Sequence, residues 1–157
     1  MWINFHQYAH LLKQDVADCF ITLQVTAPGK IVWIGTYLLP PQNEIVGEIL
    51  GYNASFLEEL YKKLLEIKRK YKALQSKNIE NALIEPKIKG VIAYNRWYGN
   101  ESVTVIVNLN DKPVTCYLKT RFKEMKVYDI LSGEEFYGNP KKLVIKVPAY
   151  TSRLLVS

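Results

Sequence analysis

The sequence has few cysteines, few histidines and no long hydrophobic run. Its two cysteines, Cys19 and Cys116, lie far apart, so the chain has neither a disulfide framework nor the close cysteine pairs of a zinc site, and we expect two buried, reduced thiols. No apolar stretch approaches the ~20 residues that span a bilayer, which excludes a membrane-spanning helix and predicts no membrane partner. The first residues do not resemble a secretory signal, so a cytoplasmic location is expected.

Motifs of several enzyme classes are also absent. The chain has no Gly-x-Gly-x-x-Gly, no Walker-type Gly-Lys-Ser/Thr and no Gly-x-Ser-x-Gly elbow, which argues against nucleotide-binding and α/β-hydrolase folds. His6 and His10 have the four-residue spacing of a two-histidine metal site, but no third ligand is apparent nearby. We therefore expect no metal and no cofactor.

Length and charge set further limits. With 157 residues the chain fits one full domain or two small ones, whereas a (β/α)8 barrel takes about 250. The 21 basic and 15 acidic residues give a net charge of +6, which by itself decides nothing. The basic residues between 62 and 72 lie opposite an apolar stripe, with Glu58, Glu59 and Glu66 interspersed, so we expect a solvated helix face and no nucleic-acid partner.

The first half of the chain has the pattern of a βαβα segment. Short apolar runs predict strands at residues 2–6 and 31–34, and apolar spacings of three and four predict a helix over residues 11–23 that ends before Pro28. A second helix is expected over residues 57–74, with Ser55 and Glu58 as a capping box. Residues 35–54 have no sustained period and are expected to be a loop, either a functional connection or a relic of a trimmed architecture.

From about residue 82, apolar residues recur at every second position. Short β-prone runs separated by marked turns predict an antiparallel β-sandwich of about seven strands. The predicted strands are 82–88, 91–97, 103–109, 114–118, 126–131, 143–147 and 152–156. The expected fold is α+β, with a helical segment at residues 1–81 packed on a sandwich domain at residues 82–157.

A cluster of aromatic residues lies at one predicted hairpin. Tyr94, Trp97 and Tyr98 either pack the sandwich or present flat faces on which a sugar ring can stack. By contrast, Glu134 and Glu135 project to opposite sides of a strand, so they cannot form the facing carboxylate pair of a glycosidase. We predict no catalytic dyad in this half.

The order of motifs in the second half resembles the C-terminal sandwich of α-amylase-type glycoside hydrolases. Residues 90–96 (GVIAYNR) and 103–114 (VTVIVNLNDKPV) resemble a strand ending in arginine followed by the family's Val-Val-Asn-Leu/Phe-Ser/Asp-x-x-Pro-Val strand. Residues 128–136 (YDILSGEEF) resemble its Asp-Leu-Leu-Ser-Gly-Glu-Glu-Tyr turn, and residues 147–156 continue the match to the end of the sandwich.

The first half adds a more distant resemblance to the end of the family's barrel. Residues 57–74 resemble the last barrel helix, residues 27–35 resemble strand eight, and residues 3–7 lie about where strand seven delivers an Asn-His-Asp motif. His6 matches the substrate-contacting histidine of that motif. Gln7, however, stands where the family has an aspartate that assists the transition state.

What the resemblance implies is a protein without its own catalytic residues. The family's nucleophile and general acid lie on earlier barrel strands, which these 157 residues do not contain, and Tyr37 stands where the family usually has a glutamate. We therefore expect a non-catalytic, structural or carbohydrate-associated module with no hydrolase activity on its own. The substrate-binding candidates are His6, Trp97 and Tyr98.

Two alternatives follow from the same resemblance. The chain is either a subunit of a split glycosidase, completed by a chain that carries the missing barrel strands, or a maltooligosaccharide-binding module that uses Trp97 and Tyr98. Because two barrel strands alone would expose their edges, a homo-oligomer or such a partner chain is expected. An α-glucan is the expected carbohydrate.

Overall fold

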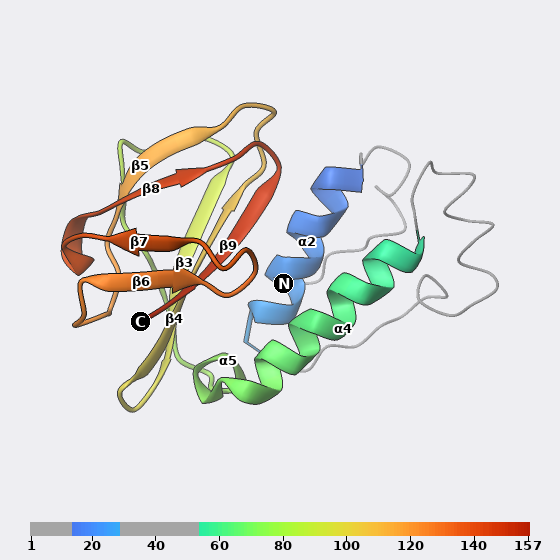
Figure 1. Ribbon diagram of the computed structural model, residues 1–157, viewed down its shortest axis with the longest axis horizontal. Coiled ribbons are helices and arrows are strands. Elements are labelled where there is room, and N and C mark those ends of the chain that lie inside the picture. Colours follow the sequence, from blue (N-terminus) through green and yellow to red (C-terminus); the bar gives the residue numbers. More distant parts are fainter. Residues whose placement is uncertain (1–13, 29–53) are drawn as a thin grey trace.

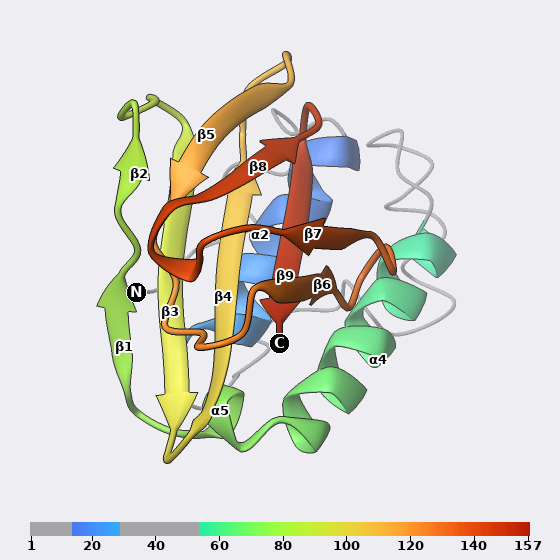
Figure 2. The same ribbon diagram turned by 60° about the vertical axis from the view of Figure 1, so that its left-hand side comes forward.

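The computed structural model describes residues 14–28 and 54–157, which form three layers (Figure 1). Two long helices, α2 (Gln14–Thr26) and α4 (Ala54–Lys70), lie side by side in the first layer, followed by the short α5 (Lys72–Gln75). Two antiparallel sheets form the other layers. The helices pack against the larger sheet, and the smaller sheet lies on its far side (Figure 2).

The helix ends follow from local sequence. α2 ends at Thr26 because the ring of Pro28 disfavours helical geometry at the residue before it, Ala27. The last turn of α4 carries Lys68, Arg69 and Lys70, which complement the negative end of the helix dipole. Lys68 also donates from Nζ to the carbonyl oxygen of Val25 at 3.0 Å, which joins the carboxyl ends of α2 and α4.

The second predicted helix is interrupted at Tyr71. This residue has φ −101° and ψ 112°, an extended conformation that separates α4 from α5, whereas the apolar spacing predicted one helix over residues 57–74. The helix begins at Ala54, and the predicted capping pair of Ser55 and Glu58 lies outside the side chains that the structure describes.

Nine strands form within the described residues. They are β1 (Ile79–Asn81), β2 (Ile84–Glu85), β3 (Val91–Tyr98), β4 (Glu101–Asn108), β5 (Val114–Leu118), β6 (Lys126–Asp129), β7 (Glu135–Tyr137), β8 (Leu143–Val147) and β9 (Thr151–Val156). A 3-10 turn, η3 (Pro140–Lys142), precedes β8. The six-stranded sheet has the order β1-β3-β4-β9-β6-β7, and the three-stranded sheet has the order β2-β5-β8.

Strand β4 is central to both hydrophobic cores. Its odd-numbered residues Val103, Val105 and Val107 face the helices, where they pack with Leu64 and Leu154. The alternating residue Ile106 faces the three-stranded sheet and packs in the second core with residues such as Leu118, Leu143 and Leu155. Because both faces are buried, the strand has a continuous apolar run rather than strict alternation.

The predicted sandwich is confirmed, with differences in detail. β5 and β8 have the predicted bounds, and the predicted strand at residues 82–88 is only the two-residue β2. β1 and β7 were not predicted because each has three residues, and such short edge strands leave little periodic signal.

Some predictions fall on segments that the structure does not describe, and others can be compared with it directly. The predicted strands at residues 2–6 and 31–34 and the predicted loop at residues 35–54 lie outside the described residues. Both cysteines are buried thiols that form no disulfide, as predicted. Among the described residues, no helix is long and apolar enough to cross a membrane.

Candidate functional site

The hairpin formed by β3 and β4 separates the two aromatic residues predicted to bind sugar. Trp97 and Tyr98 are adjacent on β3, so their side chains point to opposite faces of the sheet. Tyr98 lies on the helix side, 55% exposed, with the Lys72 ammonium 6.0 Å from its ring centroid. Trp97 lies on the other side, so the two rings cannot form one stacking platform.

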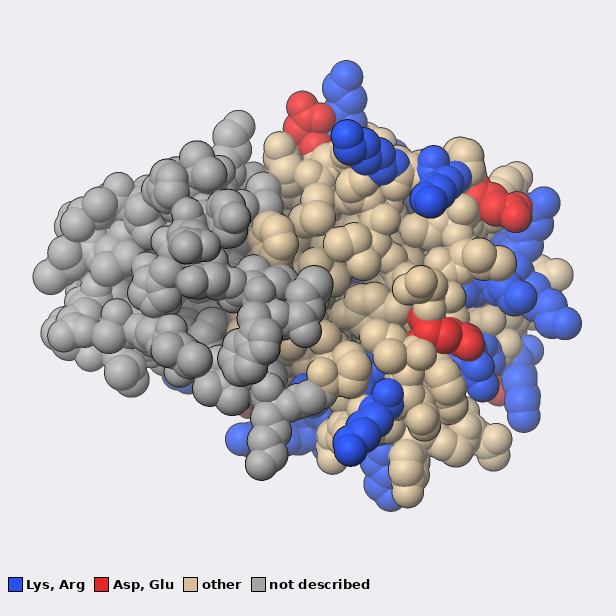
Figure 3. Space-filling model, turned by 180° about the vertical axis from the view of Figure 1, so that it is seen from behind, with Lys and Arg blue, Asp and Glu red and all other residues tan. Residues whose placement is uncertain are grey.

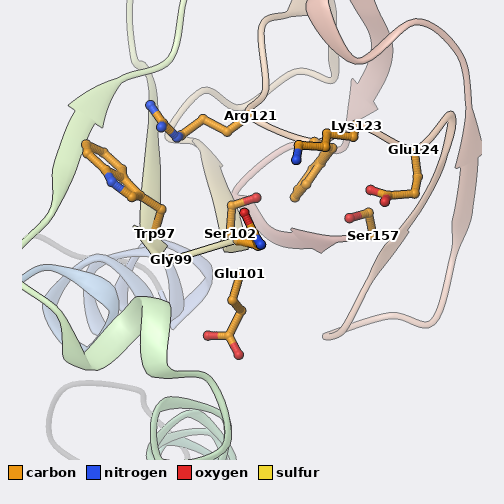
Figure 4. Close-up of a pocket in the computed structure, with 10 residues that line it drawn as sticks. Trp97, Gly99, Glu101, Ser102, Arg121, Lys123, Glu124 and Ser157 are labelled. Carbon is orange, nitrogen blue, oxygen red and sulfur yellow. The ribbon is translucent and has the colours of Figure 1, made fainter.

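Trp97 borders an open pocket at the end of the sandwich (Figure 4). The pocket has a volume of about 370 Å³ and lies among the β3–β4 turn, the β5–β6 connection and the carboxyl end of β9. The Arg121 guanidinium carbon is 4.1 Å from the Trp97 ring centroid, a cation–π contact. Arg121 also forms an ion pair with Glu80 at 3.1 Å, which fixes it over the indole.

The carboxylates that line this pocket do not face one another. Glu101 points toward α5, where its Oε1 accepts a hydrogen bond from the Ala73 backbone N–H at 2.6 Å. Glu124 lies on the opposite side of the pocket beside Ser157. Its own backbone N–H and the Ser157 hydroxyl hold the pKa of the Glu124 carboxyl below its ordinary value. The pocket therefore offers an aromatic face, cations and polar groups, but no pair of carboxylates across a bond to be cleaved.

Arg121 was not identified from the sequence. It lies in the irregular segment between β5 and β6, where no period relates it to Trp97. Only the fold brings these two residues together, so a single sequence offers no signal for this pair.

A buried arginine joins the helices to the six-stranded sheet. Arg96 is on the helix side of β3 and has no exposed surface. Its guanidinium donates to the carbonyl oxygens of Thr26, Leu74, Ser76 and Asn78. Thr26 and Leu74 lie at the carboxyl ends of α2 and α5, so the cation meets the negative ends of two helices.

Tyr94 lies two residues before Arg96 on β3 and contacts the same helix end. Its hydroxyl is 2.5 Å from Oγ1 of Thr26, with the ring buried against α2. Burial raises the pKa of Tyr94 to about 12, although Thr26 and Arg96 act in the opposite direction. Tyr94, the third member of the predicted aromatic cluster, therefore packs in the core and does not present its ring to a sugar.

The Asp-x-x-Ser-Gly-Glu turn is organised by an ion pair. Asp129 is 1% exposed and accepts hydrogen bonds from the backbone N–H groups of Leu131 and Leu154 and from the Ser132 hydroxyl. Arg153 on β9 donates to Asp129 at 3.2 Å and to Glu134 at 2.7 Å. Through Arg153, these two acidic residues of the motif hold the turn against β9.

The Val-Asn-Leu-Asn motif has a similar structural role. The buried amide of Asn108 donates to the carbonyl oxygens of Lys112, Val147 and Pro148, while its oxygen accepts from Asn110. Asn110 in turn donates to the Lys89 carbonyl at 2.9 Å. These bonds connect both ends of the β4–β5 turn to the end of β8.

The remaining predicted site residues give no further centre. His6 and His10 lie outside the described residues. Within residues 14–28 and 54–157, no group of three or more histidine, cysteine, aspartate or glutamate side chains is arranged to hold a metal ion.

Comparison with known proteins agrees with these motifs. Residues 82–154 match the family model described as "Maltogenic Amylase, C-terminal domain". The sandwich therefore resembles an amylase C-terminal domain. No curated protein matches the sequence significantly.

Several solved structures share the fold of this chain. A noncanonic maltogenic α-amylase, AmyB from Thermotoga neapolitana, is 14% identical with a TM-score of 0.69, over 95% of this chain and 38% of that one. An α-amylase from Geobacillus thermoleovorans, complexed with acarbose, is 14% identical with a TM-score of 0.64, over 90% and 33%. A debranching enzyme from Nostoc punctiforme is 14% identical with a TM-score of 0.64, over 92% and 31%.

These alignments extend beyond the amylase-type sandwich. They cover at least 90% of the chain, so the similarity includes residues before 82, where the helices lie. The chain spans about a third of the length of each of these structures. The resemblance to the C-terminal region of α-amylase-type glycoside hydrolases, predicted from the motifs, is thereby confirmed.

Proposed function

We propose that this chain is a non-catalytic structural module of the α-amylase type, in which the sandwich holds the helical segment in place. The observation that carries this proposal is the Arg96 junction, where one buried side chain on β3 binds the carboxyl ends of α2 and α5. The motif residues Asn108, Asp129 and Arg153 also serve internal hydrogen bonds. The division into residues 1–81 and 82–157 remains a prediction.

The positions of the carboxylates support the absence of hydrolase activity in the isolated chain. Retaining glycosidases need two carboxyl groups about 5–5.5 Å apart on either side of the scissile bond. In the described part of the chain, Asp129 and Glu134 are bound to Arg153, Glu80 to Arg121 and Glu135 to Lys126.

The activity test uses the purified chain and a soluble α-glucan, with release of reducing ends as the measurement. We expect no release above buffer. Release that persists through purification and is abolished by the pocket substitutions Glu101→Gln and Glu124→Gln would contradict the proposal. Release that these substitutions do not change identifies a contaminating enzyme.

A split glycosidase is the second form of this proposal. Here the chain completes a barrel supplied by another chain, and His6 contacts the substrate in the shared active site. Co-expression with an amylase-type barrel fragment should give a complex of fixed stoichiometry that cleaves α-glucan, and His6→Ala should lower its activity while the complex still forms.

Light scattering of the chain alone tests the remaining alternative, a homo-oligomer, which a monomer mass at micromolar concentration would exclude.

The pocket at Trp97 favours a further candidate function, maltooligosaccharide binding. An indole face beside Arg121, with the Ser102 hydroxyl opposite Trp97 in the register, suits the apolar face and the hydroxyl groups of a sugar ring. Tryptophan fluorescence titrated with maltoheptaose should show binding, with a dissociation constant on the order of millimolar. Trp97→Ala should abolish the response.

Tyr98 provides the matched control for this titration. Because it faces the helix side of β3, Tyr98→Ala should leave the fluorescence response unchanged, contrary to the prediction that both aromatic residues bind sugar. An unchanged signal in the wild-type protein at saturating sugar, or equal loss in the two variants, would remove this candidate.

A further inference from the structure

The outer face of the three-stranded sheet carries an unusual mixture of exposed residues. Tyr117 on β5 and Val144 on β8 are register partners at its centre, 43% and 56% exposed. Leu83, just before β2, is 60% exposed. A sheet face in water normally carries polar residues, whereas two apolar side chains are paired at the centre of this face.

Lysines surround this centre. Lys146 is two residues after Val144 on β8, so both project to the same face, and Lys119 is the exposed residue directly after β5. The Lys142 ammonium lies 4.6 Å from the Tyr117 ring centroid. All three lysines are exposed, and none forms an ion pair with a described residue.

Negative charge on this face is scarce. Glu85, opposite Tyr117 in the register, is the acidic residue on the described strands of this face. Figure 3 shows a different side, the back of the molecule, where lysine and arginine side chains are also more widespread over the sandwich than acidic ones. These three positive charges are a substantial share of the chain's net charge of +6.

We propose that this surface, defined by Tyr117, Val144, Lys119, Lys142 and Lys146, binds an acidic surface of another protein. An apolar, aromatic centre inside a ring of charged groups is the anatomy of a protein–protein interface. Uncompensated lysines select a partner of opposite charge and accelerate its association. A docking role of this kind is independent of the structural role of the helix junction, since the two lie on opposite sides of the sandwich.

The geometry favours a protein over a nucleic acid. Single-stranded nucleic acid binds where several aromatic rings stack successive bases. This face has one tyrosine on its strands, and the Lys142 ammonium already lies over its ring. The strands of this face also lack the projecting helix or ribbon that enters a duplex groove.

Fluorescence anisotropy with labelled poly-L-glutamate tests the charge complementarity in the full chain. We expect saturable binding that weakens as salt rises. The charge reversal Lys119→Glu/Lys142→Glu/Lys146→Glu should weaken binding by about tenfold or more. The matched reversal Lys77→Glu/Lys89→Glu/Lys112→Glu, which changes net charge equally outside the strands of this sheet, should weaken it by about twofold or less.

The apolar centre has its own variant. Tyr117→Ser should weaken binding of a labelled acidic copolymer of glutamate and tyrosine several-fold at moderate salt, whereas poly-L-glutamate, which has no apolar side chain, should lose less. Circular dichroism confirms that each variant is folded. Equal losses in the two reversal variants, no effect of Tyr117→Ser, or absence of binding would overturn the proposal. Tighter binding of a labelled oligodeoxynucleotide or of phosphatidylserine vesicles would also overturn it in favour of that partner.

Discussion

At the scale of single residues, the motifs that resemble the amylase C-terminal domain are explained by buried hydrogen bonding. Arg96, Asn108, Asp129 and Arg153 are almost fully buried, and each forms at least three hydrogen bonds. A buried polar group without partners costs several kcal/mol, so such residues tolerate little change. The motif therefore specifies a fold rather than a chemistry.

The Asp129–Arg153 pair gives the first prediction. Asp129→Ala leaves a buried guanidinium with only the partly exposed Glu134 as its ion-pair partner, along with two backbone N–H groups without acceptors. We expect a loss of about 3–5 kcal/mol in the free energy of unfolding, measured by urea denaturation. Glu135→Gln removes the exposed ion pair with Lys126 and should leave the denaturation midpoint close to that of the wild type. Similar midpoints for both variants would contradict this account.

The raised pKa of Tyr94 predicts that the protein loses stability at alkaline pH. Its folded pKa of about 12 exceeds the ordinary value of 10.0, so the folded state holds a proton that the unfolded state loses between these two pH values. Stability is therefore fully present below pH 10 and decreases by on the order of 2–3 kcal/mol as pH rises toward 12.

Tyr94→Phe isolates this effect from other tyrosines, including Tyr71, whose pKa burial also raises. The variant should show a shallower loss of stability above pH 10, measured by urea denaturation at a series of pH values. A pH dependence identical to that of the wild type would show that Tyr94 ionises normally.

At the scale of elements, glycines at two turns allow a matched comparison. Gly90 has φ +79°, and a Cβ there would lie 2.7 Å from Oδ1 of Asn110. Gly99 has φ +57° with open space around it. Gly99→Ala should cost about 1–2 kcal/mol for the left-handed backbone alone, whereas Gly90→Ala should cost roughly twice as much because Asn110 must move. Thermal unfolding of the two variants measures the difference, and equal costs would rule out the clash.

The elements also show how far the sequence predicts the structure. The two helices, the sandwich and strands β5 and β8 follow from hydrophobic period, because long or regular elements repeat the signal several times. The break at Tyr71 and the three-residue strands β1 and β7 depend on tertiary contacts that leave no such repeat.

The candidate site was predicted less completely. Trp97 was identified as an aromatic residue at a hairpin, but its separation from Tyr98 needs the strand alternation across β3, and its partner Arg121 comes from an irregular connection. Long-range pairs of this kind are fixed by the packing of the two sheets and not by local sequence.

At the scale of the whole molecule, the central claim is that the helices and the sandwich form one stable unit. Arg96 binds both helix ends, Lys63 donates to the Leu131 carbonyl in the β6–β7 turn, and the core on the helix side includes residues from α2, α4, β4 and β9. The helices thus bury one face of the six-stranded sheet, which would otherwise expose Val103, Val105 and Leu154 to water.

Native-state hydrogen exchange of the amides in α2 and β4 tests this claim most directly. The account predicts similar opening free energies for the two elements in the wild-type protein. In Arg96→Met, which leaves four carbonyl groups without their donor, α2 should lose at least about 3 kcal/mol of protection and β4 should lose less. Unprotected α2 amides beside a fully protected β4 in the wild-type protein would contradict the account.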